Sequence, residues 1–210
     1  MKRSYKSGEL RKDSLFLRND YKLVGSYNMP LIKKCDIDIS SIKLLGVDKV
    51  CITETSANIE KTIHFFVDDY KLDKYYYKPQ KYLERLAQYP HLLTPDFSLY
   101  TDMPIALQIY NTFRSRWCGA YWQDYNLSVI PTVGWSTNDS YSFCFDGLEE
   151  ESVVSISTIG NLLEKELFLR GYFEMIKRIK PKQILCFGKA FPEMGEEVIV
   201  VDYLSTTGRA

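Results

Sequence analysis

Carboxylates follow several short apolar runs of this chain, and they are the side chains best suited to do chemistry. Asp69 comes after His64-Phe65-Phe66-Val67, and Asp96 comes after Leu92-Leu93-Thr94-Pro95. The carboxyl ends of parallel strands meet at one edge of a sheet, where such folds usually bind ligands. Two carboxylates that meet there could share acid and base roles or hold a divalent cation. The alternative is that each caps a helix or braces a turn.

A second group of candidates lies within residues 111–123. It comprises Arg114, Arg116, Trp122 and Gln123. Arginine binds phosphate or carboxylate in bidentate fashion, and aromatic rings stack on bases or sugars. Two arginines at a spacing of two cannot share a helix face, so at most one should point into a site. The alternative is a core-packed aromatic helix whose arginine pairs with Asp96 or Asp102.

Small-residue turns after apolar runs form the third group. It comprises Trp135 and Ser136 after residues 129–133, Ser157, Thr158 and Gly160 after residues 152–156, and Gly188 and Lys189 after residues 183–187. If Asn161 caps the following helix, the amides around Gly160 could bind an anion. Trp135 could stack on a ring, and Lys189 adds a cation. The sequence there is neither GxGxxG nor a Walker loop, and ordinary strand-ending turns are the alternative.

The cysteines and histidines argue against a zinc enzyme. Five dispersed cysteines without CxxC spacing read as reduced thiols of a cytoplasmic protein, and two histidines form no metal motif. His64 and His91 are predicted to enter strands at the end opposite the site. No apolar run approaches the ~20 residues of a membrane span, and the first residues lack the apolar core of a signal peptide.

Short apolar runs alternating with helical patterns predict an α/β fold with a mostly parallel sheet of βαβ units. Candidate strands cover residues 29–34, 48–53, 64–68, 91–95, 127–133, 152–158, 183–188 and 197–202. Candidate helices cover 78–89, a segment capped by Asp102, and 161–180. The arrangement could be a small (β/α) barrel or an open doubly wound sheet. We expect a polar, basic N-terminal segment over residues 1–25 and a single domain over 26–210.

Several stretches resemble one protein family. They are HFFVDDY, LLTPDFSLYTDMP, RSR with YWQ, VIPTVGWS, CFDG, STIG and the segment ELFLRGYFEMIKRIKPKQILCFGK. Together they resemble family 4417 of the domains of unknown function, which comprises bacterial, mobile-element and phage proteins. The resemblance covers about residues 30 to 203. It implies a single α/β domain in a phage or mobile-element context, and it assigns no activity. The resemblance also implies that seven of the candidate residues belong to the family's shared pattern: Asp69, Asp96, Arg114, Arg116, Trp122, Gln123 and Trp135. The expected location is the cytoplasm of a bacterial host cell.

These observations leave two functions open. The first is a hydrolase or transferase with an anionic-ligand pocket for a nucleotide or nucleic-acid component, in which Asp69 and Asp96 act as base or metal ligands. The second is a non-catalytic binder that sequesters a small molecule or engages a host or replication protein. Formal net charge is zero, so nucleic-acid binding would depend on the basic N-terminal segment.

Overall fold

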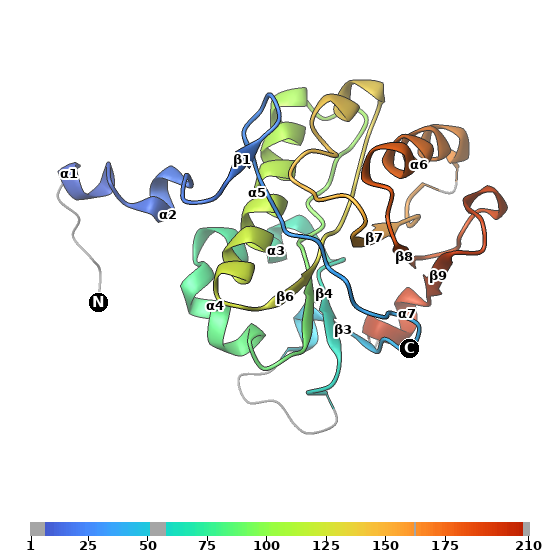
Figure 1. Ribbon diagram of the computed structural model, residues 1–210, viewed down its shortest axis with the longest axis horizontal. Helices are drawn as coiled ribbons and strands as arrows, with labels where there is room; N and C mark the ends of the chain where they lie inside the picture. Colours follow the sequence, from blue (N-terminus) through green and yellow to red (C-terminus); the bar gives the residue numbers. More distant parts are fainter. Residues whose placement is uncertain (1–6, 51–57, 162, 208–210) are drawn as a thin grey trace.

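The computed structural model describes residues 7–50, 58–161 and 163–207, which form two parallel sheets with helices outside them (Figure 1). The first sheet has the order β3-β4-β5-β6, and the second has the order β7-β8-β9. All their strand pairs are parallel. The strands are β3 (Leu44–Gly46), β4 (Thr62–His64), β5 (His91–Leu93), β6 (Ser128–Ile130), β7 (Val153–Ser157), β8 (Gln183–Phe187) and β9 (Val198–Val201).

The two sheets are joined where β6 runs on toward β7. Thr132 and Ser155 form an isolated parallel bridge, and the Val133 amide donates to the Ser155 carbonyl at 2.8 Å. The outer edges of the two sheets are β3 and β9. Among the described residues these two strands do not pair, so no closed barrel forms. The short helix α7 (Tyr203–Thr207) lies at that opening, where the Thr206 hydroxyl is 2.9 Å from Nε2 of His64. The fold is therefore α/β with a parallel sheet that curves like a barrel wall without closing.

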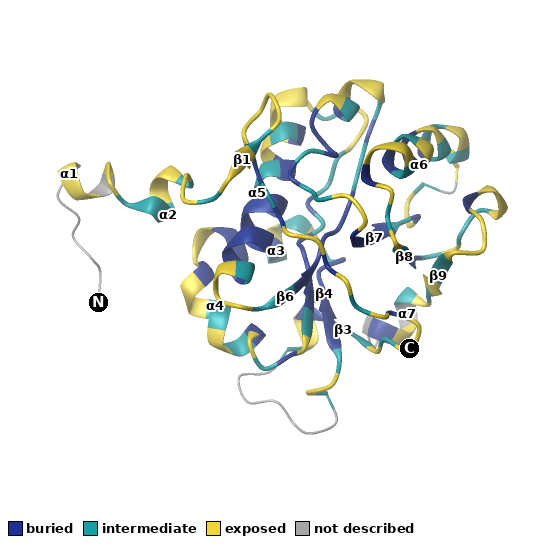
Figure 2. Cartoon of the chain, viewed as in Figure 1, coloured by how far each residue is buried: buried dark blue, intermediate teal, exposed yellow. Residues whose placement is uncertain are grey.

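Each central strand sends alternate side chains to the two faces of its sheet, as the two-residue period of a strand requires. Leu92 and Val129 pack outward, whereas their neighbours Leu93 and Ile130 face a shared inner cluster. In the second sheet, Val154 faces outward and Val153 inward. β4 is buried along its whole length and β7 up to its last residue, whereas the edge strand β9 is only partly buried (Figure 2). Burial on both faces explains why the central strands are nearly continuous apolar runs.

Helices cover the outer face of each sheet. Those beside the first sheet are α3 (Asp69–Tyr77), α4 (Pro79–Leu86) and α5 (Ile105–Asp124), and α6 (Lys165–Ile179) lies beside the second. From α5, Trp117 and Trp122 are almost fully buried against the first sheet, and from α6, Tyr172 and Met175 pack against the second. Three 3-10 turns complete this layer, η1 (Val47–Lys49), η2 (Asn138–Ser142) and η3 (Pro192–Met194).

The N-terminal part of the described chain carries α1 (Ser7–Leu10), α2 (Ser14–Leu17) and a hairpin of β1 (Leu23–Val24) with β2 (Met29–Pro30). Arg18 attaches this part to the domain. Its guanidinium lies 3.8 Å from the Trp117 ring centroid and donates to the Tyr76 carbonyl at 2.8 Å. The polar, basic N-terminal segment therefore has one cation packed against the aromatic helix layer.

Several boundaries differ from the predictions. The described part of the strand expected at residues 48–53 is wrong, because Val47–Lys49 is a 3-10 turn, and the strand β3 lies just before it. Residues 51–53 of that prediction lie outside the described residues. The helix expected from Asn161 begins only at Lys165. The helix expected from Asp102 begins at Ile105, after Pro104 in the N-cap position, and Asp102 caps nothing. Proline suits this start because the first helical turn needs few amide donors.

Candidate functional site

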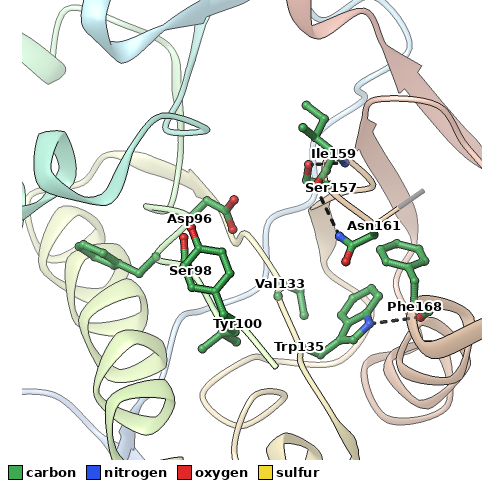
Figure 3. A pocket seen from close by; sticks show the side chains of 13 residues that line it. Asp96, Ser98, Tyr100, Val133, Trp135, Ser157, Ile159, Asn161 and Phe168 are labelled. Carbon is green, nitrogen blue, oxygen red and sulfur yellow. Dashed lines mark hydrogen bonds between the residues drawn. The ribbon is translucent and has the colours of Figure 1, made fainter. Parts of the chain in front are cut away.

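A pocket of about 200 Å³ opens at the carboxyl ends of β5, β6 and β7 (Figure 3). Three loops line it, one after each strand, together with α6. The lining residues are Asp96, Phe97, Ser98, Leu99, Tyr100, Val133, Gly134, Trp135, Ser157, Ile159, Gly160, Asn161 and Phe168. Four of these were singled out in the loops by sequence alone: Asp96, Trp135, Ser157 and Gly160.

Asp96 is the ionisable side chain of this pocket. The residue is partly exposed, and it lies in the concave pocket rather than on the open surface. Burial, with a smaller contribution from the charge of Asp69, raises the pKa of Asp96 to about 7. Among the described residues no hydrogen bond or ion pair to the Asp96 carboxyl is found. A carboxyl of this kind can take up and release a proton near neutral pH.

Asp69, the other predicted carboxylate, holds the Asp96 loop in place. Its oxygens accept hydrogen bonds from the Ser98 amide at 3.2 Å and from the Ser98 hydroxyl at 2.8 Å. Asn111 of α5 donates to the Ser98 carbonyl at 2.7 Å, so both sides of this residue are fixed. Asp69 is not among the residues that line the pocket. The two predicted acids are near enough to interact, but only Asp96 faces the pocket.

Arg114 continues this brace and lies outside the pocket. Its guanidinium donates to the Asp73 carboxylate at 2.6 Å and to Oδ1 of Asn111 at 2.5 Å. It also lies flat over the Phe97 ring, at 3.8 Å from the centroid. The arginine therefore pairs within the helix layer, though with Asp73 rather than with the Asp96 or Asp102 that the sequence offered. Its effect on the site is to hold Asn111, which holds the loop.

Arg116 points to the other side of α5, as the spacing of two predicts. It is 2% exposed and donates to the backbone carbonyls of Thr132, Cys144 and Asp146 at 2.7–3.1 Å. Burial lowers its pKa to about 10, so it remains cationic at neutral pH. The structure places this charge inside the framework, where it joins the end of β6 to the 142–148 loop.

Trp122, Gln123 and Lys189 also lie outside the pocket. Trp122 is buried in the core with its ring centroid 5.1 Å from that of Phe65. The Gln123 amide exchanges two hydrogen bonds of 2.9 Å with the backbone of Lys33. Lys189 is exposed after β8. The structure thus divides the predicted binding residues between the pocket and the supporting framework.

Trp135 forms one wall of the pocket. Its indole N–H donates to the Phe168 carbonyl at 3.2 Å, and the two rings are 4.9 Å apart (Figure 3). Helix α6 admits the indole because it carries Gly171 opposite it. A Cβ on that residue would lie 2.1 Å from Cδ1 of Trp135. The sequence identified Trp135, whereas nothing local to Phe168 or Gly171 marks their part in this wall.

The turn after β7 forms another part of the pocket wall. The Ser157 hydroxyl accepts from the Ile159 amide at 3.1 Å, and Gly160 takes a φ of +85°, which favours glycine. Thr158 is turned away, since its hydroxyl donates to the Phe187 carbonyl at 3.2 Å. Asn161 faces the pocket rather than capping α6. The predicted small-residue turn exists, but the helix begins four residues after Asn161.

The prediction for His64 is wrong. It ends β4 instead of entering it, at the carboxyl edge, because β4 covers Thr62–His64. It is fully buried beside Phe187 and Thr206, and burial lowers its pKa to about 4. His91 does begin its strand, where its Nδ1 lies 2.8 Å from the Ser128 hydroxyl. Neither histidine lines the pocket.

Within the described ranges, no three His, Cys, Asp or Glu side chains gather closely enough to hold a metal ion. The four described cysteines are free and buried, and burial raises the pKa of the Cys118 and Cys144 thiols to about 12. Such thiols are poor nucleophiles. None of the helices in the described part of the chain is long and apolar enough to cross a membrane.

These features define an α/β protein with a strand-end pocket built around one buried carboxyl. The chain belongs to the family described as domain of unknown function (DUF4417), which it matches over residues 21–204. It is 38% identical to the Gene 1 protein of Mycobacterium phage L5 over an alignment of 180 residues, and this alignment covers 84% of this chain and 78% of the phage protein. It is 42% identical over 180 residues to the Gene 1 protein of Mycobacterium phage D29, covering 84% and 66%. No solved structure matches.

Proposed function

We propose that the strand-end pocket binds the base, or a similar small planar ring, of a nucleotide or nucleic-acid component, and that Asp96 exchanges a proton with it. The observation that carries this proposal is the Asp96 carboxyl itself, which lies in the pocket, has a pKa raised by burial and has no hydrogen-bond or ion-pair partner among the described residues. Keeping such a group unpaired costs stability, so its retention points to use by a ligand.

The size and lining of the pocket support a single ring. A volume of about 200 Å³ is below the ~300–1,000 Å³ of pockets for drug-sized ligands. Trp135, Phe168 and Tyr100 offer aromatic surface, while Ser98 and Asn161 offer hydrogen bonds. Stacking on aromatic side chains is the usual way in which proteins hold unpaired bases.

The charge of the lining favours the ring end of such a ligand over its anionic end. None of the thirteen described lining residues is Lys, Arg or His, and Asp69 adds a second negative charge behind Asp96. A phosphate inside the pocket would meet repulsion without a compensating cation, whereas ring N–H groups could donate to Asp96. An anionic group of the ligand would therefore lie at the mouth, beside the exposed Gly160 turn.

Asp96 gives this pocket one group for a hydrolase or transferase. At neutral pH it is present in both protonation states, so it could protonate a leaving group or accept a proton from an attacking one. The same lining without turnover would make a binder that sequesters its ligand. The proposed location for either role is the cytoplasm of a bacterial host, on the basis of the free cysteines.

The test is a binding panel of nucleobases, nucleosides and nucleoside 5′-phosphates, followed by NMR of the Trp135 indole N–H in wild type and Asp96→Asn. We expect one class of base to shift the indole signal and Asp96→Asn to weaken that binding about tenfold or more, because a buried charged hydrogen bond is lost. Asp139→Asn, on an exposed turn, is the matched control and should bind normally.

The panel also separates the alternatives. Ligand conversion over time would indicate an enzyme, and binding without conversion would indicate a sequestering protein. If no base or nucleoside perturbs Trp135, or if the free phosphates bind better than the nucleosides, the proposed ligand class is wrong.

A further inference from the structure

A second and much smaller void lies beside Asp96, between the strand ends and α5. Its volume is about 10 Å³, close to the space of one probe sphere that a single buried water needs. Asp96, Phe97, Leu99 and Gly134 line both the pocket and this void. From α5, the void is lined by Asn111, Thr112, Ser115 and Arg116. Asp96 therefore borders both the ligand-sized pocket and the water-sized void.

Thr112, one of the residues that line this void, has an unsatisfied hydroxyl. The residue is 5% exposed, and its Oγ1 is buried without a hydrogen-bond partner. Other polar groups of the lining are already used: the Thr132 hydroxyl donates to the Thr94 carbonyl at 2.7 Å, and the Ser115 hydroxyl donates to Oγ1 of Thr94 at 3.2 Å. Of the described side chains around the void, Thr112 and Asp96 are the two with hydrogen-bonding capacity and no partner found.

We infer that this void is a binding site for one ordered water molecule, which links the Thr112 hydroxyl to the Asp96 carboxyl. A buried water typically makes two to four hydrogen bonds to groups that the protein leaves unpaired, and dry voids are apolar. Leaving the Thr112 hydroxyl dry would cost on the order of the desolvation of one polar group. One water removes that cost without closing the pocket side of Asp96.

This water makes Thr112 a positioning residue that acts on Asp96. A water held by Thr112 donates to the carboxylate, and a hydrogen bond to the charged form favours that form. The charged group that acts on Asp96 from the packed elements is Asp69 on α3, which has the opposite effect. The two nearby arginines are directed elsewhere, Arg114 to Asp73 and Arg116 to backbone carbonyls. The water therefore lowers the proton affinity of the Asp96 carboxyl.

The experiment is an NMR titration of the Asp96 carboxyl carbon in the ligand-free protein, in wild type and three variants. Thr112→Val keeps the shape of the side chain but removes the hydroxyl, so the water loses a partner. We expect the proton affinity of Asp96 to rise about three- to tenfold, because a hydrogen bond to the carboxylate is weakened. Thr112→Ser keeps the hydroxyl and should keep the wild-type midpoint. Thr137→Val, outside the void, is the control and should change nothing.

Two results would overturn the inference. One is an unchanged midpoint in a folded Thr112→Val protein. The other is an equal shift in Thr112→Ser, which would assign the effect to packing. If Thr112→Val does not fold, a high-resolution crystal structure of the wild type decides: a water between Thr112 Oγ1 and Asp96 supports the inference, and an empty void refutes it. None of these readouts needs a ligand, so they stand apart from the test of the proposed function.

Discussion

Arg116 and Asp96 line the same void, yet the protein treats their two charged groups differently. The Arg116 guanidinium donates to three backbone carbonyls that join β6 to the loop after it. The Asp96 carboxyl has no partner among the described residues. Burying a charge is costly unless hydrogen bonds compensate it. The contrast teaches that a buried charge alone does not mark a site. Arg116 stabilises the framework, whereas the Asp96 carboxyl is free to bind a ligand in the pocket.

The largest effect should come from removing the satisfied charge. Arg116→Met would leave three buried carbonyls without donors, and we expect a loss of about 3–5 kcal/mol in the free energy of unfolding. Urea denaturation followed by tryptophan fluorescence measures this. Lys189→Met is the control, because Lys189 is exposed and should cost about 0.5 kcal/mol or less. A loss in Arg116→Met no larger than in the control would remove the distinction drawn here.

The pocket into which Asp96 opens depends on the position of Trp135. In Gly171→Ala the new methyl group would lie 2.1 Å from the indole, so the ring must move. We expect a loss of about 2–3 kcal/mol and a changed tryptophan emission spectrum that reports the altered pocket wall. Gly8→Ala, where a Cβ meets nothing within 4 Å, should leave both unchanged. Retention of the wild-type spectrum and stability in Gly171→Ala would contradict this packing.

Removing the unsatisfied charge of Asp96 should raise the free energy of unfolding, whereas removing the satisfied charge of Arg116 lowers it. The pKa of Asp96 is raised from 3.8 to about 7 in the folded protein, so its ionisation opposes folding. The resulting penalty is absent below the unfolded pKa, grows as pH rises between the two values, and is complete above about pH 7. Because the pocket mouth admits solvent, we expect Asp96→Asn to gain about 1–2 kcal/mol at about pH 8 and little at acidic pH. Urea denaturation of both proteins across this range measures the difference, and a variant that is less stable at high pH would contradict it.

The smallest effect tests the framework far from the pocket. Gln123→Ala removes a pair of hydrogen bonds to the Lys33 backbone, and we expect a loss of about 1 kcal/mol in the free energy of unfolding. Binding in the pocket should be unaffected. Gln80→Ala, at an exposed position of α4, provides the matched control. Weaker ligand binding in Gln123→Ala would contradict this, and Gln123 would then count as a residue that contributes to the site.

The sequence predicted the strands of the second half well, because β7, β8 and β9 are all largely apolar runs of four or five residues. It missed β3 (Leu44–Gly46), whose three residues are followed closely by the run that was predicted to be the strand. It also placed the start of α6 too early, since Asn161 looks like a cap but belongs to the pocket wall.

The site was predicted in part for the same physical reason. Asp96 and Trp135 follow strands, so their place at the carboxyl edge depends only on topology. Whether Arg114 or Arg116 reaches that edge depends on where Asp73 and the carbonyls of the 142–148 loop lie. These are tertiary contacts between distant parts of the chain, and no local pattern encodes them. Phe168 and Gly171 escaped notice for that reason too.

The most direct test of the central claim is the titration of the Asp96 carboxyl itself by carbon-13 NMR in the wild-type protein. An open, buried carboxyl predicts a midpoint near 7, which a bound base should displace. A midpoint near the ordinary 3.8 that ligands leave unchanged would show a hydrated or partnered side chain, and Asp96 would then be no different in kind from Arg116.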